Sequence, residues 1–407
     1  MHFLFAWRYF KAKKSTNAIN VIAWISILAI VAGSAALILV LSVFNGFESL
    51  VKSLYSSFYT DIKVSPASGK TIRITQAQLD QLRGIQGIQN FSLVAEEKAL
   101  IQNGEYQSVV HLKGVDENYR YVSGVAEHLP RGEYDLGTAD NPKLIMGIGV
   151  ENALGVQADR NAFALNIYLP RKGTTEQLDP MENISNDSIG TSAVFMIQQE
   201  FDNKYGITNL AFAKRAMKFA PDEYSGLEIR TTDADVTDEA LPRVKAIFAS
   251  GYKVQNRYQQ NQSLYSVMTL ERWIIYGVLS LILVVAAFNM IGALTMLVLE
   301  KQKDISVLHA LGGNRKLIHR IFLSEGVLLA AIGGGAGMLI ALIICILQIN
   351  FHLIPLQGGS FLIDYFPVKL RVLDFLLVGA TVLVIALIAS WLPARKAAGR
   401  EFSLRSE

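Results

Sequence analysis

The chain has 407 residues, of which 51% are hydrophobic and only 18% are charged, with a mean hydropathy of +0.30 and a net charge of +3. A typical soluble domain carries roughly 25% charged residues, so this composition excludes a soluble enzyme and a disordered protein. The small net charge gives no reason to expect a nucleic-acid partner. Four windows without Asp, Glu, Lys or Arg, each long enough for a membrane helix of about 20 residues, lie at 15–47, 273–299, 326–363 and 375–394.

The N-terminal segment predicts an amphipathic helix over 1–18 that lies along the inner leaflet of a membrane, because its aromatic and basic side chains fall on opposite faces. A plain cytosolic extension of the first span is the alternative. The apolar run from Ile19 to Phe44 is about 26 residues long, whereas a signal peptide has only about 7–15 apolar residues. We therefore expect a retained first span.

Basic residues cluster before residue 15, within 300–320 and after 394, whereas the segment between the third and fourth windows has few. Positively charged short loops stay in the cytoplasm, so both termini and the 300–320 loop are predicted to be cytoplasmic. The large segment between the first and second spans is then predicted to lie on the outer side of the membrane. The expected boundaries are membrane spans at 19–45, 271–299, 321–349 and 373–394, an outer domain at 46–270, a coupling element at 300–320, an outer loop at 350–372 and a cytoplasmic tail at 395–407.

The sequence of the outer domain predicts a mixed α and β fold. A strand–helix–strand pattern over 60–95 recurs over 226–258, which predicts a split ferredoxin-like core over 46–115 and 226–270. An inserted β-rich lobe is expected over 116–225, with a long exposed loop over 170–190. His111 lies in a strand pattern and is expected to be structural, and no catalytic motif, zinc motif or phosphate-binding loop is present in the sequence.

The cytoplasmic segment predicts a docking element. Ile305, Leu308 and Leu311 recur at helical spacing, Gly312 and Gly313 end that helix, and Asn314 can cap a short amphipathic helix after it. The third span also carries a small-residue face with a GxxxG step, which predicts close helix packing through Gly333 and Gly337.

Several stretches resemble the permeases of lipoprotein-releasing ABC transporters, LolC and LolE, within the MacB/FtsX superfamily. The resemblance rests on Leu-Ser-Val-Phe-Asn-Gly-Phe-Glu at 41–48, on the run from Glu271-Arg-Trp through Glu300-Lys-Gln-Lys-Asp to Gly313, and on Pro-Ala-Arg-Lys-Ala-Ala at 393–398. It implies four transmembrane helices with a large MacB-like mixed α/β periplasmic domain between the first and second, which is an α+β membrane protein.

The resemblance also implies partners and site residues. Two copies of a cytosolic ABC ATPase would hold ATP and Mg, with no cofactor, metal or catalytic residue on this chain, which is not an enzyme by itself. The expected ATPase-coupling residues are Glu300, Lys303, Asp304, Leu308, Leu311, Gly312, Gly313, Asn314, Arg315 and Lys316. Acyl chains of a lipid-anchored protein would lie among membrane lipid beside Leu41, Val43, Phe44, Phe47, Ile275, Val278, Leu279 and Ile282. A second permease copy or a paralogue would complete the complex, and a periplasmic lipoprotein carrier would be contacted through Arg171, Lys172, Pro180 and Met181.

The expected function is a permease that extracts lipid-anchored proteins from the outer leaflet and passes them to the carrier, driven by ATPase motion transmitted through the helices. Two alternatives from the same superfamily stay open. One is a MacB-like export component, and the other is an FtsX-like regulator of a periplasmic hydrolase that transports nothing. An enzymatic outer domain has no support from the residues.

Overall fold

A computed structural model of the chain describes residues 17–160, 164–170, 184–356 and 363–399. These residues form two compact units. The membrane unit contains the described residues up to Leu50 and those from Ser266 onward, and the outer domain contains Val51–Tyr265. The expected amphipathic helix over 1–18 lies almost wholly outside the described residues, so its position stays a prediction.

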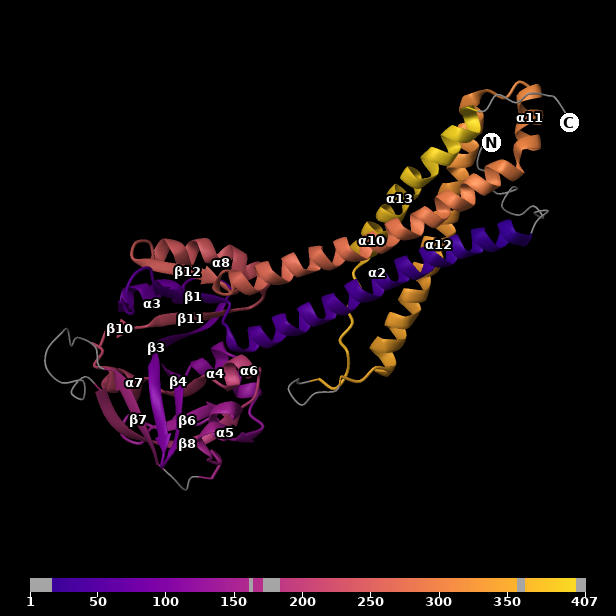
Figure 1. Cartoon of the computed structure of the whole chain (residues 1–407). Helices are drawn as coiled ribbons and strands as arrows, with labels where there is room; N and C mark the ends of the chain where they lie inside the picture. Colours follow the sequence, from indigo (N-terminus) through magenta and orange to yellow (C-terminus); the bar gives the residue numbers. More distant parts are fainter. Residues whose placement is uncertain (1–16, 161–163, 171–183, 357–362, 400–407) are drawn as a thin grey trace. The chain divides into compact units, whose positions relative to one another are not determined.

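The membrane unit is built on four long apolar helices, each with a stretch apolar enough to cross a membrane. They are α2 (Asn17–Phe58), α10 (Gln262–Glu300), α12 (Arg315–Phe351) and α13 (Val372–Gly399), with the short helix α11 (Gln302–Ala310) between α10 and α12 (Figure 1). A bilayer core needs about 20 helical residues, and α2 and α10 have 42 and 39. Both helices therefore extend past the expected spans 19–45 and 271–299, and their ends supply residues to the outer domain.

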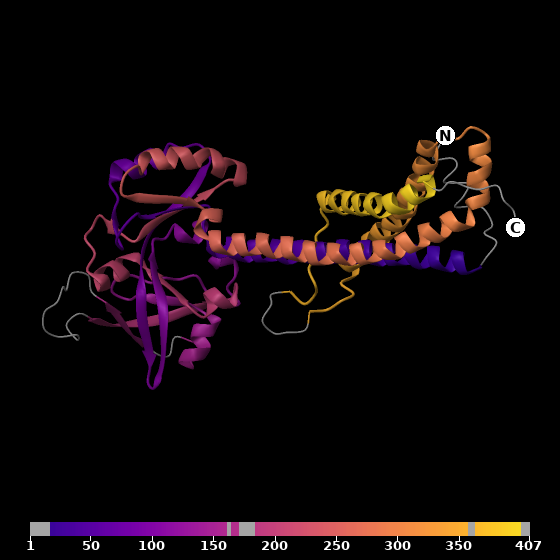
Figure 2. The same ribbon diagram turned by 45° about the horizontal axis from the view of Figure 1, so that its top comes forward.

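Helix α12 packs closely on its neighbours through glycines, and it runs beside α13 in both views (Figures 1 and 2). A Cβ added at Gly333 would lie 3.1 Å from Ile30 Cβ in α2, and one added at Gly337 would collide with the carbonyl oxygen of Val31. Gly326 and Gly334 instead face α13. The absent side chains allow the backbones to approach, which is how helices associate where lipid removes the hydrophobic driving force.

The first part of the outer domain is a ferredoxin-like sheet. Two strand–helix–strand units form it, namely β1 (Ile62–Pro66), α3 (Gln76–Arg83) and β3 (Ile88–Asn103), then β11 (Gly226–Thr231), α8 (Ala234–Ile247) and β12 (Tyr252–Asn256). The strand order is β12-β1-β11-β3, with every neighbour antiparallel. Helices α3 and α8 cover one face (Figure 1). On this face Leu82 and Val244 are buried in one cluster with Ile62 and Ile229. The predicted split ferredoxin-like core is confirmed.

The second part is a closed ring of six strands. Hydrogen-bonded pairs run from β3 through β4 (Tyr106–Val115), β9 (Tyr205–Asn209), β6 (Lys143–Gly147), β8 (Ile184–Phe195) and β7 (Leu165–Pro170) back to β3. The 16-residue β3 belongs to both parts, because its first half pairs with β11 and its second half with β4. The smaller elements are β2 (Ile72–Arg73), α4 (Tyr119–Val122), η1 (Val125–Glu127), β5 (Arg131–Gly132), α5 (Ile148–Leu154), α6 (Gln199–Asp202), α7 (Leu210–Met217), β10 (Glu223–Tyr224) and α9 (Arg257–Gln260).

The exposed loop expected over 170–190 is wrong for residues 184–190, because β8 begins at Ile184 and pairs with β7 from Pro170 to Leu165. The polar residues of 184–190 alternate along the strand with buried ones, so Ser185 and Ile189 point inward while Asn186 and Ser188 point outward. The β-rich lobe also extends beyond 116–225, since β4 and half of β3 complete its ring.

Candidate functional site

The expected coupling element forms a tight turn between α11 and α12. Gly312 has a φ of +89°, a left-handed conformation that favours glycine. Its N–H donates to His309 O at 3.0 Å and the Gly313 N–H donates to Leu308 O at 2.8 Å, which are the two bonds of a Schellman motif. Asn314 Oδ1 accepts from the Leu317 N–H at 2.8 Å and caps α12. The helix after the turn is not the short amphipathic helix expected, because it continues to Phe351 as the third span.

The tip of this turn exposes apolar and basic side chains together. Leu311 is 79% exposed, Val307 is also exposed one helical turn before it, and Arg315 and Lys316 are exposed directly after the turn. Ile305, from the same predicted apolar stripe, is instead buried in the core of the membrane unit. Val307 was not among the predicted coupling residues, although its i,i+4 spacing to Leu311 is visible in the sequence.

The remaining predicted coupling residues lie along the same segment. Glu300 ends α10, Lys303 is exposed on α11, and Asp304 pairs with Lys301 at 3.3 Å. An exposed leucine beside cations on a rigid helix turn suits docking into an apolar groove with an acidic rim.

The membrane unit contains a cavity of about 330 Å³ beside the first turns of α13. Its walls come from α2, α13 and α10, including the first turns of α10 before its apolar run. The lining residues are Leu41, Glu48, Met268, Thr269, Arg272, Trp273, Tyr276, Leu373, Asp374 and Leu377. Of the eight residues predicted to line a lipid groove, Leu41 lines this cavity.

The other seven predicted groove residues lie elsewhere on α2 and α10. Val278 and Ile282 are on the exposed face of α10, and Phe47 makes an edge contact with Phe366 at 5.9 Å between ring centres. Val43, Phe44, Ile275 and Leu279 are half-buried. The exposed face of α10 is rich in large apolar side chains, which suits lipid or a second membrane chain.

A buried charged group lies at the wall of this cavity and was not predicted. Asp374, only 2% exposed, accepts hydrogen bonds from Arg272 Nη2 and from Asn45 Nδ2, each at 2.5 Å. These contacts join α10, α2 and α13, which are separated by more than 100 residues in the chain. A local signal existed, since Arg272 and Asp374 each stand directly before a window without charges.

The outer domain contains a second buried ionic cluster, where β1, β3, β4 and β11 meet. Lys113 Nζ lies 2.8 Å from Glu228 Oε1 and donates to the Tyr119 hydroxyl at 2.9 Å. Glu96 lies beside it, 3.9 Å from Lys63 and 3.6 Å from His111. Burial alone would raise the pKa of the Glu96 carboxyl, but Lys63, the hydrogen bond from His111 and the charge of Lys113 outweigh burial and lower the pKa to about 2. His111 is thus placed in a charge network, next to the ring of Tyr205.

Comparison with known proteins finds two family models that each match part of this chain. The model of the FtsX-like permease C-terminal domain matches residues 276–402, and the model of the MacB-like periplasmic core domain matches residues 23–156. The lipoprotein-releasing system transmembrane protein LolE of Haemophilus influenzae is 26% identical over 97% of this chain and 96% of its own length. LolC of Neisseria meningitidis serogroup B is 25% identical over 98% of this chain and 97% of its own length.

The chain resembles the LolC and LolE permeases. A solved structure, the periplasmic region of MacB from Actinobacillus actinomycetemcomitans, is 11% identical and covers 53% of this chain and 98% of its own, with a TM-score of 0.36. The FtsX-like match contains the turn at Gly312 and Gly313, the glycines of α12, and Asp374.

The structure does not describe the residues predicted to contact a carrier. These residues, Arg171, Lys172, Pro180 and Met181, lie between the described ranges 164–170 and 184–356. Within the described ranges, no group of three or more His, Cys, Asp or Glu side chains is placed to hold a metal ion.

Proposed function

We propose that this chain is the permease subunit of an ATP-driven lipoprotein-releasing transporter in the bacterial inner membrane. In this proposal it extracts lipid-anchored proteins from the outer leaflet and passes them to a periplasmic carrier. The observation that carries the proposal is the similarity to named lipoprotein-releasing permeases over nearly the whole chain. Both termini and the coupling turn are cytoplasmic in this proposal, and the outer domain is periplasmic.

ATP hydrolysis is assigned to a separate cytosolic ATPase, present in two copies with its ATP and Mg. The turn at 311–316 supports this assignment, because it presents Leu311 with Arg315 and Lys316 on a rigid Schellman turn. A second permease copy or a paralogue completes the complex. The exposed apolar face of α10 supports a membrane partner or lipid there.

The test is reconstitution of the full chain with its ATPase and partner permease in liposomes that contain a tri-acylated lipoprotein. We expect lipoprotein to move to a soluble carrier with ATP and not with a non-hydrolysable analogue. An export component or a non-transporting regulator predicts ATP hydrolysis that lipoprotein does not change and no release. Such a result would reject the proposed function.

The docking role of the turn has its own test. Leu311→Asp places a charge at the exposed tip without burying it, and we expect ATPase binding to fall at least about tenfold, which corresponds to about 1.4 kcal/mol. Leu353→Asp is the matched control, because Leu353 is also an exposed leucine and lies just after the other end of α12. Equal binding by both variants, measured by co-purification and by titration of the ATPase, would contradict the docking role.

Carrier contact through the segment after β7 is also part of the proposal. Because β8 begins at Ile184, a deletion for this purpose should remove residues 172–183 and leave the strand intact. We expect the deletion to abolish carrier binding in a pull-down while ATP hydrolysis continues. Unchanged carrier binding would remove this part of the proposal.

A further inference from the structure

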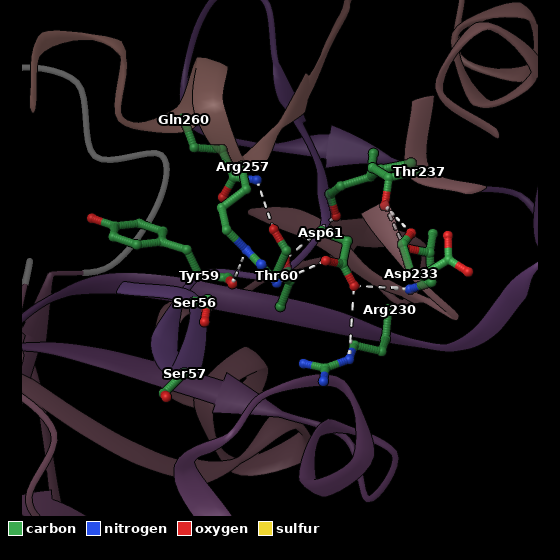
Figure 3. Close-up of polar contacts among 12 residues, drawn as sticks. Ser56, Ser57, Tyr59, Thr60, Asp61, Arg230, Asp233, Thr237, Arg257 and Gln260 are labelled. Atoms are coloured by element: carbon green, nitrogen blue, oxygen red, sulfur yellow. Dashed lines mark hydrogen bonds and ion pairs between the residues drawn. The ribbon is translucent and has the colours of Figure 1, made fainter. Parts of the chain in front are cut away.

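Helix α2 ends at Phe58, and the three residues that follow connect it to strand β1. The carbonyl groups just beyond a helix end have no partners within that helix, so something else must satisfy them. Here two side chains from helix α9 do so (Figure 3). Arg257 Nε donates to Tyr59 O at 3.2 Å, and Gln260 Nε2 donates to Thr60 O at 3.0 Å.

Helix α9 is the segment that leads into α10, with only Asn261 between them. The contacts therefore join the end of one long helix to the start of the other. Both peptide groups and both side chains belong to the outer domain.

Asp61 is the centre of this arrangement (Figure 3). Its Oδ1 accepts from Arg257 Nη2 at 2.7 Å, its Oδ2 accepts from the Thr231 N–H at 2.9 Å, and Arg230 Nε lies 3.7 Å from Oδ2. The Asp61 carbonyl also accepts from the Arg257 N–H at 3.1 Å. With its side chain only 13% exposed, Asp61 connects the start of β1, the end of β11 and the start of α9.

Aromatic packing holds the last turn of α2 in the same place. The Phe58 ring stacks on Phe201 with 4.3 Å between ring centres, and Tyr205 lies 4.6 Å from it. Tyr55, one turn earlier, donates to Glu200 at 2.5 Å. These contacts fix the end of α2 on the six-stranded lobe, while the Asp61 contacts fix it on the ferredoxin-like sheet.

We propose that Asp61 and Arg257 are positioning residues that hold the end of α2 and the start of α10 at a fixed spacing. When these two helices move, the outer-domain strands attached to them then move together. This inference rests on the proposed function. The physical reason is the planar guanidinium, which bonds the Asp61 carboxylate and the Tyr59 carbonyl at once and so removes freedom that a flexible three-residue connection would have. Coupling between distant sites is carried by such networks and by rigid helices.

The test compares Asp61→Asn with Asp80→Asn in the full reconstituted complex. Asp80 pairs with Arg83 at the same 2.7 Å, but on the exposed surface of α3. We expect Asp61→Asn to lower the lipoprotein released per ATP hydrolysed by about fivefold or more, which is the lower end of typical coupling effects. The ATPase rate should stay within about twofold of wild type, and Asp80→Asn should match wild type in both measurements.

Arg257→Lys is the second variant, because lysine keeps the charge but lacks the planar fork that reaches both acceptors. It should show the same loss of release per ATP, with a melting temperature of the outer domain close to that of wild type. If Asp61→Asn fails to fold, release per ATP hydrolysed by the Arg257→Lys variant tests the inference alone.

Wild-type release per ATP in a folded Arg257→Lys or Asp61→Asn variant would overturn the inference. A drop in release that only follows a drop in melting temperature would overturn it too, since that pattern indicates a structural role. Absence of ATP-dependent release by the wild-type complex would instead reject the proposed function.

Discussion

Replacement of Lys113 by methionine tests the buried ionic cluster of the outer domain. The Lys113 side chain is 3% exposed, and its ammonium group pairs with Glu228, which is equally buried, at 2.8 Å. The same group donates to Tyr119 and lies 5.3 Å from the centre of the Phe58 ring. Methionine has a similar length and fills the space, so the change removes the charge and leaves the volume nearly constant.

The expected cost follows from the carboxylate left behind. Removal of one partner of a buried pair costs about 3–5 kcal/mol, because an uncompensated charge stays in the interior. Lys63, 3.6 Å from Glu228, offsets part of this cost, so we expect a value near 3 kcal/mol. For a domain of this size that corresponds to a fall in melting temperature on the order of 10 °C.

The assay measures thermal unfolding of the full chain in nanodiscs by calorimetry. Lys70→Met is the matched control, because Lys70 pairs with Glu97 at the same 2.8 Å but is 75% exposed. Exposed pairs contribute less than about 1 kcal/mol, so this variant should melt almost like wild type. The double variant Lys113→Met with Glu228→Gln should recover part of the loss. Equal shifts for Lys113→Met and Lys70→Met would refute the reasoning.

Two further predictions concern the outer domain and the membrane helices. Because the pKa of Glu96 is lowered from 4.5 to about 2, its ionised form stabilises the fold above pH 4.5, and this contribution is lost as the pH falls from 4.5 to about 2. Glu96→Gln should therefore flatten the dependence of melting temperature on pH across that interval, and an unchanged curve would contradict the assignment. Gly337→Val should destabilise the membrane unit by about 1–3 kcal/mol through overpacking against α2. Gly335→Val is its control, since among the described residues nothing lies within 4 Å of a Cβ added there, and equal melting in detergent of both variants would count against the packing role.

The features that could be predicted from the sequence are those with a local cause. Windows without charge indicate the four apolar helices directly, because a single charged side chain is costly in lipid. The turn at Gly312, Gly313 and Asn314 could also be predicted, since a left-handed glycine and an asparagine cap act through bonds within a few residues. The repeated strand–helix–strand pattern was sufficient for the ferredoxin-like core, because each unit is local even though one begins at Ile62 and the other at Gly226.

The features that could not be predicted depend on long-range pairing. Closure of the six-stranded ring requires β7 to pair with β3, and the sequence of β7 contains no signal for that partner. The polar character of 184–190 favoured a loop because outward-facing residues of a surface hairpin look the same as loop residues in one sequence. The contacts of Asp374 with Arg272 and Asn45 join three helices, and charges at helix ends are ordinarily expected to face water.

The placement of buried polar groups bears on the kind of protein this is. Three largely buried charged groups among the described residues lie at joints between segments far apart in sequence. Asp374 joins α2, α10 and α13, Lys113 joins β4 to β11, and Asp61 joins the start of β1 and the end of β11 to the start of α9. A charge-assisted hydrogen bond adds geometric specificity, and loss of one partner of a buried pair is costly because it leaves an uncompensated charge. Joints of this kind suit a subunit whose parts must move as rigid pieces, which is the behaviour that the proposed permease requires.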